Sequence, residues 1–172
     1  TADFTESWVS DIYIGAPDPN GDKVVYFTTG NTRVSDNVIK NHKHSSISDI
    51  YLGILNSTED EITINALPIS LGLNPPYKDV YCLLVDDNGT SQSNDDIIFV
   101  GSDLALHVGD FTNGLVAVTS PIDITASSYE VTSLLRIDQD KILVTIHGYG
   151  VYMYDHSLPS NPWTKFMISL NV

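Results

Sequence analysis

The chain has 172 residues, of which 22 are acidic and 8 are basic, and its formal net charge is −14 at pH 7. Because so many carboxylates repel phosphate groups, the composition argues against nucleic-acid binding and against an anionic membrane as a partner. Apolar residues make up 42% of the chain, which excludes a disordered acidic tail, and no segment approaches the ~20 apolar residues needed for membrane insertion.

The N-terminal segment TADFTESWVSDIYIGAP (1–17) has an extended-looking composition. Its first seven residues are mostly polar, yet Phe4 among them and Trp8 just after them are costly to leave in water. One interpretation is an ordinary edge strand with a frayed start. The other is a strand that joins the sheet of a neighbouring copy, with main-chain hydrogen bonds giving affinity and apolar pockets giving register. The candidate assembly residues are Phe4, Trp8, Val9 and Ile12.

After this segment, short runs rich in Val, Ile, Thr and Tyr alternate with Gly, Pro, Asn or Asp about every 8–12 residues, which is typical of β-strands. The predicted strands are 24–29, 49–55, 61–65, 79–86, 96–101, 104–108, 115–119, 129–137, 141–147, 151–154 and 164–170. No segment keeps a helical period over ten residues. The sequence therefore predicts an all-β protein, with a candidate donor strand (1–14) and a single β-sandwich or jelly-roll-like domain (15–172).

Acidic residues are concentrated in short loops. The loop VDDNGTSQSNDD (85–96) contains four aspartates and no basic residue. If Val85–Asp86 pairs with Asp96–Ile97, these carboxylates face each other, which is unfavourable unless a cation or water lies between them. Calcium takes six to eight oxygen ligands from loops of this kind. The candidate ligands are Asp86, Asp87, Asn88, Asp95 and Asp96, with Asp18, Asn20 and Asp22 in DPNGD and Asp138 and Asp140 in DQD.

Turn chemistry and solvation account for any one of these clusters taken alone. Asp18, Asn20 and Asp22 have the opening spacing of an EF-hand loop, but no Gly follows at position 23 and no Glu falls at the twelfth position. Several such clusters on a chain with few bases lead us to expect at least one calcium ion. If its ligands come from two subunits, calcium binding also drives assembly.

Sequence templates for catalysis are missing from the chain. There is no G-x-S-x-G, H-E-x-x-H, P-loop or G-x-G-x-x-G pattern. Adjacent aspartates in one loop do not supply the two opposed carboxyl groups that a glycosidase needs. We therefore expect that the protein is not an enzyme.

The expected location is extracellular. The chain begins with Thr1 rather than Met, as a secreted protein does after removal of its signal segment, and as a chain shortened for expression also does. Two sequons, Asn56-Ser57-Thr58 and Asn88-Gly89-Thr90, are compatible with a glycan at Asn56 or Asn88.

The segment SWVSDIYIGAPDPNGDKVVYFTTGNT (7–32), which opens an acidic, helix-poor chain of this length, resembles the cannula-forming proteins of hyperthermophilic archaea. Those are extracellular subunits that polymerise into hollow tubes when calcium is added. The resemblance implies a jelly-roll-like sandwich, a strand of about residues 1–10 donated to the next subunit, and calcium at subunit contacts. The low charged fraction of 17% and three Asn-Gly pairs depart from what hyperthermophile proteins usually show.

The sequence thus favours a secreted structural subunit that assembles with copies of itself into a filament or tube, by strand donation and calcium bridging. A carbohydrate-associated β-sandwich is the alternative. The segments EITINALPISLGL, DVYCLL and YEVTSLLRI resemble the small C-terminal β-domain of α-galactosidases, which implies an accessory or sugar-binding module. Tyr149, Tyr152 and Tyr154 could stack on sugar rings, although strand aromatics more often belong to a core. A third alternative is a phage or surface adhesin subunit.

Overall fold

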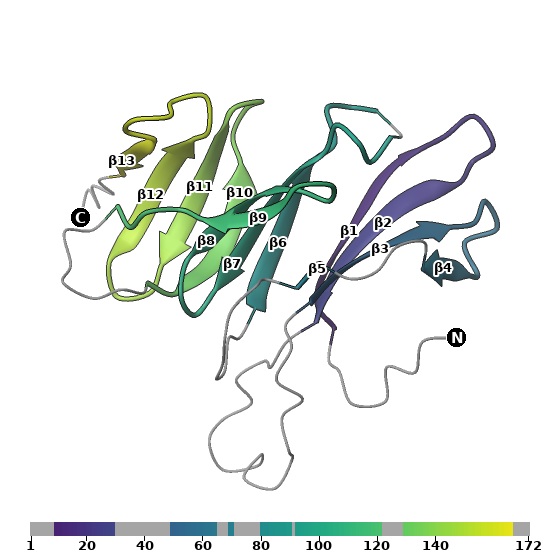
Figure 1. Ribbon diagram of the computed structural model, residues 1–172, viewed down its shortest axis with the longest axis horizontal. Helices are drawn as coiled ribbons and strands as arrows, with labels where there is room; N and C mark the ends of the chain where they lie inside the picture. Colours follow the sequence, from purple (N-terminus) through teal and green to yellow (C-terminus); the bar gives the residue numbers. More distant parts are fainter. Residues whose placement is uncertain are drawn as a thin grey trace, which may run out of the picture.

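The computed structural model describes residues 9–29, 49–64, 69–70, 80–90, 92–121 and 129–166, which form short strands joined by turns (Figure 1). The strands are β1 (Val9–Pro17), β2 (Lys23–Thr29), β3 (Asp49–Leu55), β4 (Ile62–Ile64), β5 (Ile69–Ser70), β6 (Val80–Asp86), β7 (Ile97–Ser102), β8 (Leu106–Asp110), β9 (Gly114–Ala117), β10 (Val131–Arg136), β11 (Lys141–Ile146), β12 (Gly150–Asp155) and β13 (Trp163–Lys165). Within these ranges there is no helix with the length and apolarity needed to cross a membrane.

The strands form three antiparallel sheets that lie side by side as layers (Figure 1). The first sheet has the order β1-β2-β3-β4, and the short strand β5 also pairs with β3. The middle sheet has the order β6-β7-β8-β9, and the third has the order β10-β11-β12-β13. Neighbours in each sheet are thus also neighbours in sequence, with β5 as the one departure among the described strands.

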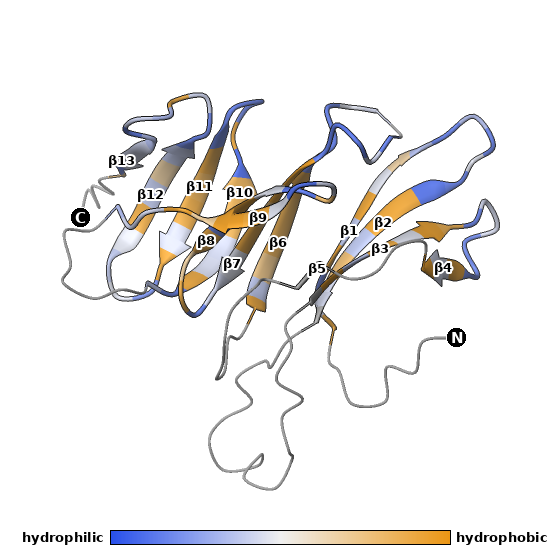
Figure 2. Cartoon of the chain, in the orientation of Figure 1, coloured by the Kyte–Doolittle hydropathy of each residue, from blue (hydrophilic) through white to orange (hydrophobic). Residues whose placement is uncertain are grey.

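The middle sheet is covered on both faces, and this double burial holds the layers together. One cluster of buried side chains joins it to the first sheet: Val24, Tyr26, Ile50, Val80, Leu83, Val85, Ile98 and Val100. A second joins it to the third sheet: Cys82, Phe99, Ala105, Leu106, Tyr129, Val131, Ile142, Val144, Ile146, Tyr152 and Tyr154. Each buried aliphatic side chain contributes roughly 1.5–3 kcal/mol. Figure 2 shows the matching pattern, with apolar residues along the strands and hydrophilic residues in the turns that connect them.

The contact between the middle and third sheets is unusually close at Gly101 in β7. A side chain there would place its Cβ 2.6 Å from Cγ1 of Val131 in β10, and also 2.4 Å from Sγ of Cys82, its cross-strand partner in β6. Glycine is therefore required by the approach of β10 rather than by a turn.

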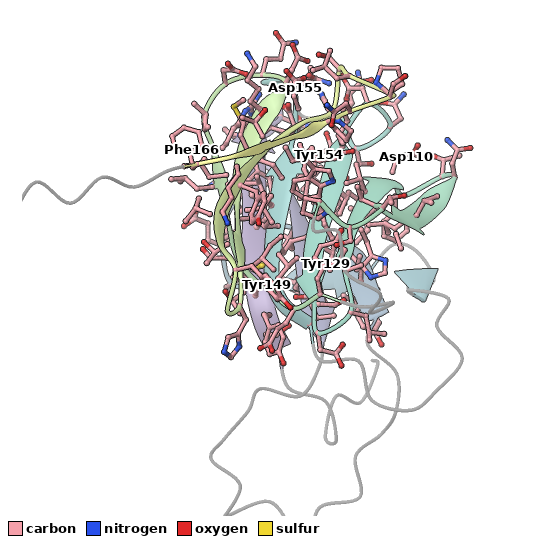
Figure 3. All side chains as sticks on the ribbon, turned by 90° about the vertical axis from the view of Figure 1, so that its left-hand side faces the viewer. Asp110, Tyr129, Tyr149, Tyr154, Asp155 and Phe166 are labelled. Atoms are coloured by element: carbon pink, nitrogen blue, oxygen red, sulfur yellow. The ribbon has the colours of Figure 1, made fainter. Side chains whose placement is uncertain are left out.

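Aromatic residues fill much of the third sheet's inner face. Tyr152 and Tyr154 are buried, and Figure 3 places Tyr154 and Tyr149 at opposite ends of this sheet. The prediction that strand tyrosines belong to the core is confirmed for Tyr152 and Tyr154, whereas Tyr149 is 43% exposed in a turn.

The prediction of an all-β protein is confirmed, but the arrangement differs from a two-layer sandwich because three sheets are stacked. A jelly roll also places strands from distant parts of the sequence side by side, whereas these sheets follow the order of the chain. The expected boundary between residues 14 and 15 lies inside β1, which pairs with β2 along most of its length.

Candidate functional sites

The loop between β6 and β7 carries the four aspartates that the sequence singled out, and its strand register separates them. Asp86 pairs with Ile97, and Val85 with Ile98, so the expected pairing of Asp86 with Asp96 is wrong by one residue. Because side chains alternate between the faces of a strand, this register sends the two carboxylates to opposite sides of the middle sheet. Asp86 faces the third sheet and Asp96 faces the first.

Asp86 forms an ion pair with Arg136, which lies in β10 of the third sheet. Its carboxylate lies 2.7 Å from Arg136 Nη2, and its side chain is only 4% exposed. The backbone N–H of Asn88 donates to the same oxygen of Asp86 at 3.1 Å. The buried charge is therefore compensated inside the chain, and this pair connects β6 to β10.

Asp87 and Asp96 contact tyrosines of the first sheet instead. The hydroxyl of Tyr13 in β1 donates to Asp87 Oδ2 at 2.8 Å. The hydroxyl of Tyr26 in β2 donates to Asp96 Oδ2. Burial opposes ionisation of Asp87, but the Gly89 N–H and the Tyr13 hydroxyl hold the pKa of that carboxyl below its ordinary value. The loop thus binds to both of the sheets that flank it.

Asp96 is the most unusual group in the loop. It is 3% exposed, and its second oxygen, Oδ1, has no hydrogen-bond partner. Burial raises the pKa of Asp96 to about 6, against the lowering effect of the Tyr26 hydroxyl, and the charges of Asp95 and Asp87 add to the rise. An ionised carboxylate at this position is costly because one of its oxygens lacks a donor.

The smaller acidic clusters are turns closed by their own side chains. Asp18 Oδ1 accepts the backbone N–H groups of Asn20 and Asp22 at 2.8 and 2.9 Å. Asp138 Oδ1 accepts the N–H of Asp140 at 3.1 Å, and Asp140 lies 3.3 Å from the ring of His156. These bonds are the turn chemistry expected of Asp and Asn at such positions.

The remaining predicted ligands also take part in the β6–β7 loop. Asn88 adopts a left-handed conformation at φ 49°, as its position before Gly89 predicts, and its amide donates to the carbonyl of Asp95. Thr90 donates to Asp95 Oδ1. In the part of the chain that the structure describes, no three His, Cys, Asp or Glu side chains gather as they would around a metal ion. Calcium bound at these clusters would therefore need further oxygen ligands, from amide side chains, the main chain, water or another subunit.

The outer face of the first sheet is apolar along three strands; Val25 and Phe27 in its middle are buried, and its exposed apolar residues lie around them. Ile12, Phe27 and Tyr51 form one cross-strand row, in which the two aromatic rings stack 5.1 Å apart. A second row runs through Ile14, Val25, Gly53 and Ile64. The apolar side chains most exposed on or beside this face are Val9 at 54%, Ile12 at 49%, Ile14 at 48% and Ile62 at 41%.

Of the predicted assembly residues, Val9 and Ile12 lie in β1 and pair with β2 of the same chain. Phe4 and Trp8 lie outside the described residues. Of the two sequon asparagines, Asn56 lies in the β3–β4 turn, where its amide donates to Asp60, and Asn88 lies in the β6–β7 loop. Glycosylation at either asparagine stays a prediction.

Comparison with known proteins finds no match, either among protein-family models or among curated proteins. The resemblance to cannula-forming proteins stays a prediction as well. The residues and their geometry are therefore the basis on which a function can be proposed.

Proposed function

We propose that this chain is a secreted, non-catalytic structural subunit that assembles with copies of itself into an extracellular filament or tube. The observation that carries the proposal is the apolar outer face of the first sheet, with β1 at its edge. Edge strands of soluble proteins usually carry charges or other features that prevent pairing with another chain. Here three exposed positions of β1, Val9, Ile12 and Ile14, are apolar instead.

Charge supports the choice of this face over others. With a net charge of −14, two copies repel each other wherever their carboxylates come close. The two rows through Ile12 and Ile14 carry no carboxylate, and in the adjoining turn Glu59 is paired with Lys23, while Asp60 and Glu61 lie exposed at one end of the face. Two copies that meet here bury apolar surface and bring few like charges together, which favours assembly.

Strand donation fits the position of β1. Since residues 9–17 form a strand within their own chain, the donated segment would consist of residues upstream of Val9, including Phe4 and Trp8. Those residues would extend from the edge strand beside the apolar face and pair with the sheet of the next copy. The assembly would then combine main-chain hydrogen bonds with the apolar contact.

Calcium is proposed to act between subunits rather than within one. Asp86 and Asp96 are buried and bonded inside the chain, whereas Asp95, Asp138 and Asp140 are exposed. A divalent cation shared by exposed carboxylates of two copies would remove the repulsion between them and supply part of the binding free energy.

The test is an assembly assay on calcium-free protein. We expect that adding millimolar calcium to the EDTA-dialysed chain increases light scattering and gives filaments or tubes in electron micrographs. The paired substitution Ile12→Glu and Ile14→Glu should abolish both signals, because it places charges on the apolar face. The matched control is Leu135→Glu, since Leu135 is 62% exposed on β10 of the third sheet. The control should assemble like the unmodified chain.

Three results would count against the proposal. A chain that stays monomeric with and without calcium would refute self-assembly. Normal polymers of the Ile12→Glu, Ile14→Glu chain would exclude the outer face as the contact. Normal polymers of a chain that lacks residues 1–8 would refute strand donation while leaving the apolar contact in place.

A further inference from the structure

A groove of about 720 Å³ lies where the middle and third sheets end near each other. One wall comes from β8, β9 and the segment Val118–Pro121, and the other from the end of β12 and the loop Leu158–Pro162 that leads to Trp163. This volume is within the ~300–1,000 Å³ typical of small-molecule sites. The groove lies apart from the outer face of the first sheet, so it is not part of the proposed assembly contact.

The groove contains an aromatic side chain held in a fixed orientation. The indole N–H of Trp163 donates to the carbonyl of Thr119 at 3.0 Å, and this bond joins the two walls at one end. Its ring packs edge-on against Tyr154, with 4.9 Å between the ring centroids, and the ring centroids of Tyr152 and Tyr129 lie 6.3 Å away. Because the indole is positioned before any ligand arrives, little conformational entropy is lost on binding.

The charge of the lining is unlike that of the rest of the chain. Among the described residues, those that line the groove include no Asp, Glu, Lys or Arg, although 17% of the chain is charged. Of these described lining residues only His156 and Tyr154 are ionisable, and the imidazole is directed to Asp140 at 3.3 Å. The polar side chains of the walls are hydroxyls and an amide, from Thr119, Ser120, Ser160 and Asn161. Such a lining gives no advantage to an ionic ligand.

We propose that this groove binds a neutral saccharide. A pyranose ring has an apolar C–H face that packs on an indole, and hydroxyls around its edge that bond to hydroxyl and amide side chains. Trp163 supplies the first contact, and Ser160 and Asn161 on the neighbouring loop supply the second. An apolar peptide is the competing occupant, but its side chains would make no use of the hydroxyl and amide groups at the rim of the groove.

The experiment is calorimetric titration of the full chain with cellohexaose, xylohexaose, laminarihexaose and mannohexaose, with tetragalacturonate as an anionic comparison. We expect saturable binding of at least one neutral hexasaccharide and none of tetragalacturonate. Val116→Asp should weaken that binding about tenfold, because it replaces an apolar contact of the groove wall with a strongly hydrated carboxylate without disturbing the core. Val116 is 72% exposed. Leu135→Asp, at a comparably exposed apolar site on β10, should bind like the unmodified chain.

The proposal is overturned if no neutral hexasaccharide binds at millimolar concentration, if Val116→Asp binds as well as the unmodified chain, or if tetragalacturonate binds equally. Trp163→Phe, which keeps an aromatic ring in the cluster, provides a second variant and should also weaken binding. Light scattering with calcium separates this proposal from the assembly proposal. Val116→Asp should assemble normally, so loss of saccharide binding and loss of assembly are distinct failures.

Discussion

Replacing Asp96 by Asn should make the folded protein more stable at neutral pH. Asp96 is 3% exposed, and its Oδ1 atom has no hydrogen-bond partner. Its neighbours Asp95 and Asp87 add negative charge nearby, and burial raises the pKa of Asp96 to about 6. Asn keeps the shape of the side chain and an oxygen for the Tyr26 hydroxyl, but it removes the poorly compensated charge.

The size and sign of the effect follow from the pKa. The native carboxyl titrates near pH 6 and the unfolded one near 3.8, a difference of about two units, which corresponds to about 3 kcal/mol. Because the pKa is raised on folding, the contribution of Asp96 to the free energy of unfolding is greatest below about pH 4. It decreases as the pH rises to about 6 and stays at the lower value above that.

The assay is urea unfolding of the unmodified chain and of Asp96→Asn at several values between about pH 4 and about pH 7.5. We expect the variant to be more stable by about 2–3 kcal/mol at the upper end and equal to the unmodified chain at the lower end. Asp95→Asn, which removes an exposed charge from the same loop, should change stability by less than about 1 kcal/mol at every pH. A difference between Asp96→Asn and the unmodified chain that does not vary with pH would refute this reasoning.

Two further predictions concern the contacts between sheets. Arg136→Met should lower the free energy of unfolding by about 2 kcal/mol, because Asp86 then stays buried and keeps the Asn88 N–H as donor without the guanidinium. Arg136→Lys should lower the free energy of unfolding by less, because it keeps a positive charge near Asp86. Urea unfolding of both variants checks this, and a loss below about 0.5 kcal/mol for Arg136→Met would contradict it. Gly101→Ala should cost about 2–3 kcal/mol, because its Cβ would lie 2.4 Å from Cys82 Sγ and 2.9 Å from the Val131 carbonyl. A thermal midpoint equal to that of the unmodified chain would show that the sheets move apart at little cost.

The strands were predictable because alternation and turn residues are local signals. The prediction for 49–55 coincides with β3 (Asp49–Leu55), and that for 141–147 differs from β11 by one residue. The sequence also contains a local pattern that indicates the stacking of three sheets. VYCLLV (80–85) and IIFVG (97–101) are nearly continuous apolar runs, which indicate burial on both faces of a sheet.

The acidic loop was less predictable because its register depends on turn geometry rather than on composition. A shift of one residue places Asp86 opposite Ile97, and the carboxylates then face different sheets. The partners of these carboxylates, Arg136 and the two tyrosine hydroxyls, come from strands distant in the sequence. No local pattern connects them with the loop. An excess of Asp therefore indicated where turns lie, but not that Asp86 and Asp96 are buried and bonded to different sheets.

The distribution of charge bears on how an apolar edge strand can coexist with an excess of carboxylates. An exposed strand with Val9, Ile12 and Ile14 on one face is a hazard for uncontrolled pairing with other chains. A net charge of −14, with many carboxylates in the turns, opposes the approach of a second copy at low ionic strength. That repulsion acts over roughly 10 Å at 0.1 M salt, whereas the apolar contact acts only when surfaces touch. Under the assembly proposal, these two features would keep the subunits separate until a cation reduces the repulsion, and the apolar face would then form the contact.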